Sequence, residues 1–175
     1  MDYKTKSISR NKIRKIAKLF REEFQECLSK DKLYFDVIRC FEIINFKYPN
    51  VTTEICDDGE LGDNPGRCIP DFKGNYHIKI KNSVYEGAKD GTGGYRTHII
   101  HEISHAFLCM LGYTPILDRE FNNKELRPFE SMEWQAKALA GEILMDYELT
   151  KGLNILQLEI YCGVSMDGAI FRATH

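Results

Sequence analysis

Two histidines and a glutamate, spaced as His-Glu-x-x-His over residues 101–105, are the residues of this chain best suited to metal chemistry. On an α-helix, residues four apart lie about 40° apart around the axis and about 6 Å apart along it. The imidazoles of His101 and His105 would therefore leave one face together and reach one ion. Imidazole is a common zinc ligand, and a glutamate beside the ion can take a proton from water. The spacing predicts a Zn²⁺ site with Glu102 as its general base.

The flanking sequence predicts a helix over about residues 95–111. Glycines stand before this segment and after it, where a helix can begin and end. An apolar stripe near a 3.6-residue repeat runs along it and consists of Ile100, Ile103, Phe107 and Met110. The alternative is an ordinary core helix with two histidines that bind nothing. The agreement between the stripe and the histidine spacing favours the metal site.

A hydrolytic zinc site needs a third protein ligand and keeps one open position. In the metzincin pattern a third histidine follows six residues after the second, but Leu111 stands there in this chain. The other histidines outside this helix, His77 and His175, are isolated in the sequence. We therefore expect a carboxylate from a second helix.

The segment after Pro128 predicts that second helix, because proline is favoured at a first helical position. Its apolar stripe consists of Met132, Ala136, Leu139, Ile143 and Tyr147. Glu133 lies just beside this stripe, and Glu130 lies on the same side one turn earlier. From the residues alone, either glutamate is a candidate for the third ligand.

Three segments resemble the ImmA/IrrE family of zinc metallopeptidases. The first is the motif helix with Arg96 five residues before His101. The second, residues 133–145, resembles the family block E-x-x-A-N-x-F-A-A-x-L-L-M-P. The third, residues 161–172, is similar to the closing segment F-x-V-S-x-x-A-x-x-x-R. The segments occur in the family order over roughly the last 80 residues.

This resemblance implies a zincin-like, gluzincin-type site in which Glu133 is the third zinc ligand. It also implies a substrate class, because family members inactivate helix-turn-helix repressors of phages, mobile elements and stress responses. The chain departs from the second block at four positions, none of which is a ligand: Lys137 for asparagine, Leu139 for phenylalanine, Gly141 for alanine and Asp146 for proline.

The chain length of 175 residues suits a single domain. We expect an α+β fold that is mainly helical, with a small β-sheet beside the zinc helix. The expected parts are N-terminal helices (8–30 and 34–47), strands and loops (51–56, 57–66, a turn at 72–75, and 76–80), zinc helices within 95–147 joined by a loop at 112–127, and C-terminal helices within 152–173. No room remains for a helix-turn-helix domain.

Charge and hydropathy limit which kinds of partner and which cellular compartment are expected for this chain. A net charge of −2 argues against direct nucleic-acid binding, which needs a basic face. The lysines and arginines near the N-terminus alternate with apolar residues at helical spacing, which indicates an amphipathic helix. No apolar run approaches the ~20 residues that span a bilayer, and no signal peptide is visible. With six scattered cysteines and no C-x-x-C pair, these features predict a cytoplasmic protein with reduced thiols. They do not predict an oligomeric state.

The leading hypothesis is a cytoplasmic zinc endopeptidase that cleaves a helix-turn-helix repressor. One alternative is a non-proteolytic module, stabilised by zinc, that relieves repression by contact alone. Another is a peptidase for a toxin or a host protein, since the loops expected to shape the cleft (57–74 and 112–128) carry no resemblance. The donor that stabilises the oxyanion remains open among Tyr95, Arg96, His98 and Tyr113.

Overall fold

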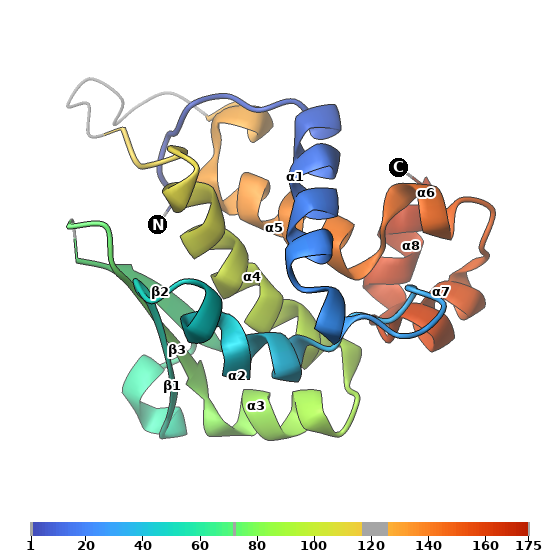
Figure 1. Cartoon of the computed structure of the whole chain (residues 1–175), viewed down its shortest axis with the longest axis horizontal. Coiled ribbons are helices and arrows are strands. Elements are labelled where there is room, and N and C mark those ends of the chain that lie inside the picture. The colour runs from blue at the N-terminus through green and yellow to red at the C-terminus, as the bar shows by residue number, and fades with distance from the viewer. Residues whose placement is uncertain (1, 72, 117–125, 175) are drawn as a thin grey trace.

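One long helix, α4 (Gly93–Met110), runs through the middle of the molecule and carries the His-Glu-x-x-His residues (Figure 1). A small sheet and two helices lie on one side of it, and two further helices lie on the other. Three short helices close the chain. The computed structural model describes residues 2–71, 73–116 and 126–174. Together they form an α+β fold around one continuous core, as the sequence predicts.

The helices around α4 come from both halves of the chain. They are α1 (Arg10–Glu23), α2 (Val37–Lys47), α3 (Asn82–Lys89), α5 (Met132–Leu144), α6 (Tyr147–Thr150), α7 (Ile155–Cys162) and α8 (Met166–Thr174). Three 3₁₀ turns accompany them: η1 (Gln25–Cys27), η2 (Asp58–Leu61) and η4 (Pro128–Glu130). Among the described residues, no helix combines the length and the apolar character needed to cross a bilayer.

The sheet has three strands in the order β1-β3-β2, with β1 at Val51–Cys56, β2 at Gly66–Pro70 and β3 at Tyr76–Lys81. β1 runs parallel to β3, and β2 pairs antiparallel to β3. The two strands predicted at 51–56 and 76–80 are confirmed. β2 was not predicted, because it begins at a glycine, ends at a proline and lacks apolar alternation. Its position matters, since this edge strand packs directly against α4.

Apolar side chains from α1 and α4 form the centre of the core. Phe20 is fully buried, stacks on Phe24 with ring centroids 4.6 Å apart, and meets Phe107 edge-on at 4.9 Å. Ile100 and Ile103 are fully buried as well. Burial of each such side chain is worth about 2–3 kcal/mol. The apolar stripe predicted for α4 therefore faces the core. Met110, at the end of this stripe, is only partly buried.

The first helix is shorter than predicted and ends at Glu23 instead of near residue 30. The side chain of Asp31 accepts hydrogen bonds from the hydroxyl of Ser29 and from the backbone N–H of Leu33. Lys32 adopts a positive φ of 60°. Such local side-chain bonds compete with helical hydrogen bonds and favour turns. The second helix likewise begins at Val37, where Asp36 caps it, and not at residue 34.

Two helices near the site also differ from expectation. Pro128 opens the 3₁₀ turn η4, and α5 itself begins at Met132 with Ser131 as its cap. α3 was not predicted, because its short sequence includes Gly87. A Cβ at Gly87 would lie 2.2 Å from the ring of Tyr95, so this glycine allows α3 and α4 to approach. The predicted C-terminal helices are confirmed as α7 and α8. Of the loop predicted at 112–127, residues 117–125 lie outside the described residues.

A buried arginine fixes the N-terminal end of α4. Arg96 is fully buried, and its guanidinium donates hydrogen bonds to the carbonyls of Phe35 (2.5 Å), Cys162 (2.9 Å) and Gly163. Burial lowers the pKa of this guanidinium. The ring of Tyr34 lies 4.1 Å from it. Arg96 thereby ties α4 to the start of α2 and to the end of α7.

We expect Arg96→Met to destabilise the protein by about 2 kcal/mol, because it leaves buried carbonyls without donors. Methionine keeps most of the volume, so the loss reports hydrogen bonds more than packing. The free energy of unfolding in urea measures this effect. Lys89→Met, on the exposed end of α3, is the control and should change stability by no more than about 0.5 kcal/mol. Equal stability of Arg96→Met and wild type would contradict the role given to Arg96.

Candidate metal centre

The two histidines of α4 face the same side of the helix, as their spacing predicts. Their Nε2 atoms lie 3.2 Å apart, and their ring centroids are 4.6 Å apart with the ring planes at 81°. Each side chain is 13% exposed. Both nitrogens therefore point into one small, partly enclosed space beside α4.

Glu133, in the first turn of α5, directs its carboxylate into that space. Its Oε2 lies 3.3 Å from Nε2 of His101, and its Oε1 lies 3.3 Å from Nε2 of His105. Ligand atoms around a tetrahedral zinc ion with bonds of about 2.0–2.1 Å lie about 3.3–3.4 Å apart. The donor atoms of these residues thus have the spacing of a zinc coordination shell. His101, His105 and Glu133 could hold a metal ion and leave a fourth position for water or substrate.

Glu130, the other candidate for the third ligand, does not join this group. It lies in η4, where its carboxylate forms an ion pair with Lys4 at 3.7 Å. The structure therefore favours Glu133 over Glu130 as the third candidate ligand, a choice that the residues alone left open. His77 lies away on β3 and pairs with Glu54 at 2.6 Å, and His175 lies outside the described residues.

The N-terminal segment holds Glu133 in place, which the sequence did not predict. Asp2 accepts hydrogen bonds from the hydroxyl of Ser131 and from the backbone N–H of Glu133, the latter at 3.2 Å. Ser131 in turn caps α5 by accepting from the N–H of Trp134 at 2.9 Å. The N–H of Met132 donates to the carbonyl of Tyr3 at 3.0 Å. The contacts of Asp2 and Tyr3 join residues more than a hundred positions apart, so no local pattern reveals them.

Hydrogen bonds with His101 and His105 hold the pKa of the Glu133 carboxyl well below its usual range. The opposite ring atom of His101, Nδ1, is buried and has no hydrogen-bond partner among the described residues. A carboxylate ionised at neutral pH beside two imidazole nitrogens is a donor set that suits Zn²⁺. The residues present therefore fit the metal that the motif predicts.

Glu102 lies on the neighbouring side of α4, against the edge strand β2. It is 8% exposed. Burial raises the pKa of its carboxyl above the usual range, although electrostatic interactions with His101 and His105 and with the backbone of Cys68 offset part of this rise. A carboxylate held beside the ligands by a backbone donor has the position of a general base. β2 thus supplies a wall of the site that the sequence did not predict.

Gly66, at the start of β2, leaves room for Glu102. A Cβ at this position would lie 2.9 Å from Cγ of Glu102 and 2.6 Å from Cδ1 of Ile80. We expect Gly66→Ala to destabilise the protein by about 2 kcal/mol through overpacking. Urea denaturation measures this loss. Gly94→Ala in α4 is the matched control, because a Cβ there meets nothing within 4 Å; equal effects of the two variants would contradict the contact with Glu102.

The structure narrows the candidates for the oxyanion donor. Arg96 is excluded, because its buried guanidinium is committed to backbone carbonyls. Tyr95 is excluded too, since its ring packs on Gly87 of α3, away from the ligand face. His98 is exposed and interacts electrostatically with His101, and Tyr113 is 4% exposed just beyond α4. His98 and Tyr113 remain the candidates.

Comparison with models of known protein families gives no match, and comparison with curated proteins gives no significant match.

Proposed function

We propose that this chain is a zinc-dependent endopeptidase with a zincin-like site of the ImmA/IrrE type. One observation carries the proposal. The carboxylate of Glu133, from a separate helix, lies 3.3 Å from Nε2 of both His101 and His105. Glu102, the residue that a hydrolytic site needs and a structural site does not, is buried directly beside them.

The packing of the three family-like segments supports the resemblance. Arg96 of the first segment donates to the carbonyl of Cys162 in the third. Arg172, near the end of the third segment, forms a bidentate ion pair with Glu142 of the second at 2.8 and 3.1 Å. Segments that resemble one family in sequence order are thus also bound to one another in space.

In the proposed mechanism, His101, His105 and Glu133 hold the ion and Glu102 moves the proton. Bound Zn²⁺ would supply polarisation of the scissile carbonyl and a lower pKa for water in the site. Glu102 accepts a proton from the attacking water and delivers it to the leaving amide nitrogen. Packing of Glu102 against Gly66 of β2 limits the orientations that its side chain can adopt.

The edge strand β2 offers a place for an extended substrate. In the described sheet, β2 pairs with β3 on one side only, and it packs against α4 beside Glu102. An extended peptide can add to such an edge through backbone hydrogen bonds. This geometry favours a polypeptide as the substrate, cleaved within the segment that lies along β2.

We further propose, on the resemblance alone, that the substrate is a helix-turn-helix repressor of a phage, mobile element or stress response. The protein would act in the cytoplasm, where such repressors bind DNA. The net charge of −2 supports binding to the repressor itself over direct binding to nucleic acid.

The experiment is incubation of the purified chain and one equivalent of Zn²⁺ with a helix-turn-helix repressor encoded beside its gene. We expect two repressor fragments in intact-mass spectra and no fragments when a chelator is present. An intact repressor that still binds this chain and releases its DNA would instead favour the non-proteolytic module. An intact repressor that does not bind this chain would indicate that the substrate is another protein.

A further inference from the structure

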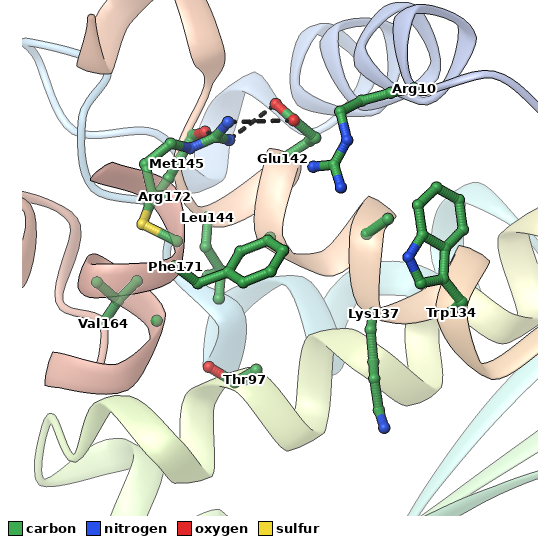
Figure 2. Close-up of a pocket in the computed structure, with 13 residues that line it drawn as sticks. Arg10, Thr97, Trp134, Lys137, Glu142, Leu144, Met145, Val164, Phe171 and Arg172 are labelled. Carbon is green, nitrogen blue, oxygen red and sulfur yellow. Dashed lines mark hydrogen bonds and ion pairs between the residues drawn. The ribbon is translucent and has the colours of Figure 1, made fainter. Parts of the chain in front are cut away.

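A pocket of about 330 Å³ lies on the side of α5 that faces α8 and the start of α1 (Figure 2). Its walls are mainly apolar and include Trp134, Met145, Val164 and Phe171. Three different parts of the chain meet there, because α1, α5 and α8 all contribute side chains. The volume is within the range of small-molecule sites, which begins at about 300 Å³.

A glycine forms part of the pocket wall. Gly141 lines the pocket from the middle of α5, and a Cβ built on it meets nothing within 4 Å. Glycine in a helix interior costs about 1 kcal/mol relative to alanine, so the sequence forgoes stability at this position. A dry apolar cavity of about 150 Å³ holds benzene, so this pocket has room for an apolar body of roughly ten carbon atoms.

One positive charge lies directly at the pocket. Arg10 places its guanidinium 5.6 Å from the ring centre of Trp134 and 5.8 Å from that of Phe171. Lys137 also lines the pocket, but its ammonium group is directed away from Arg10 (Figure 2). Within the described part of the chain, neither cation forms an ion pair with a carboxylate.

The acidic residue in the lining does not offset this charge. Glu142 is 2% exposed and is held by Arg172 at 2.8 Å and by Arg14 at 3.3 Å (dashed in Figure 2 for Arg172). Its carboxylate is therefore neutralised within the protein, and Arg10 keeps its charge for a ligand. An apolar interior with a cation at its edge complements an anion that carries an apolar body.

We propose that this pocket binds an aliphatic carboxylate of about eight to ten carbon atoms, with its chain between α5 and α8 and its carboxylate against the guanidinium of Arg10. The site is separate from the candidate metal centre but adjoins it. Trp134 follows Glu133 in the chain, and Thr97, which also lines the pocket, lies one turn before His101. Binding does not depend on the proposed peptidase activity, so it can be tested on metal-free protein.

The probe is octanoate, titrated into the metal-free full-length chain. Trp134 is the single tryptophan of the chain, so its fluorescence reports occupancy of the pocket directly. We expect saturable binding, which calorimetry confirms without relying on fluorescence. Because a charge-assisted contact is worth about 1.4 kcal/mol, or tenfold in affinity, 1-octanol should bind about tenfold more weakly than octanoate. Acetate, which has the charge without the chain, should not bind.

Two kinds of variant localise the binding. Gly141→Leu fills the pocket with a better helix former and should weaken octanoate binding at least about tenfold, whereas Gly141→Ala should stay within about threefold of wild type. Arg10→Gln should weaken it about fivefold, as expected for loss of a partly solvated charge pair, whereas Lys137→Met, which removes a charge directed away from Arg10, should stay within about twofold of wild type. Circular dichroism verifies that each variant is folded.

Several results would overturn the proposal. Octanoate binding that is unchanged in Gly141→Leu would place the ligand elsewhere. Equal affinities for octanoate and 1-octanol would show that Arg10 does not bind the carboxylate. Tighter binding of a blocked Phe-Glu dipeptide than of octanoate would show that the pocket receives a polypeptide segment instead.

Discussion

Glu102→Gln is expected to lower repressor cleavage about 1,000-fold, within the 10²–10⁴-fold range of general acid–base catalysis, while zinc stays bound. Glutamine has the shape of glutamate and can keep the contact with the backbone of Cys68, but it cannot take a proton from water. His101, His105 and Glu133 are untouched by the change. The measurements are kcat/KM for repressor cleavage and zinc content per chain.

This variant also separates the proposed peptidase from a binding module. A peptidase loses both cleavage and relief of repression in cells when Glu102 is replaced. A module that acts by contact alone keeps relief of repression in the same variant. Full cleavage by zinc-loaded Glu102→Gln would remove Glu102 as the base, and some other group would have to move the proton.

Glu133→Gln is expected to weaken zinc binding about 1,000-fold, more than the 10–100-fold that loss of an outer-shell partner costs. The amide cannot carry the negative charge that stands 3.3 Å from both imidazoles. Competition with a chelator of known affinity measures the change. Cleavage should fall in parallel, because the enzyme would no longer retain zinc at micromolar concentrations.

Glu130→Gln is the matched control for this prediction. Glu130 lies three residues earlier and loses only a solvent-accessible ion pair with Lys4, which is worth about 0–1 kcal/mol. Zinc affinity should be unchanged in this variant. Equal zinc affinity of Glu133→Gln and Glu130→Gln would show that the third ligand lies elsewhere in the chain.

The features that sequence alone could predict are those with a short period. The pair His101 and His105 needs only a helix, and the apolar stripe with Ile100 and Ile103 supplies the evidence for one. Both isoleucines are fully buried, and both histidines face one space. Glu133 needed the family resemblance as well, because its distance from Glu130 is less than one turn of a helix.

The parts that sequence could not predict depend on contacts between distant residues. Asp2 reaches the start of α5, and Gly66 brings β2 against Glu102, although neither has a periodic or motif signal. Arg21 behaves in the same way. Its guanidinium donates to the carbonyl of Ile143 near the end of α5, where the last carbonyls lack helical partners. In sequence it looks like an ordinary surface cation.

We propose that one zinc ion, held by His101, His105 and Glu133, makes this chain a peptidase. The initial rate of repressor cleavage, followed as zinc is titrated into the metal-free protein, tests this proposal most directly. We expect no cleavage without zinc and a rate that rises linearly to a plateau at one equivalent per chain. Cleavage that is independent of zinc, or zinc saturation at one equivalent without any cleavage, would contradict it.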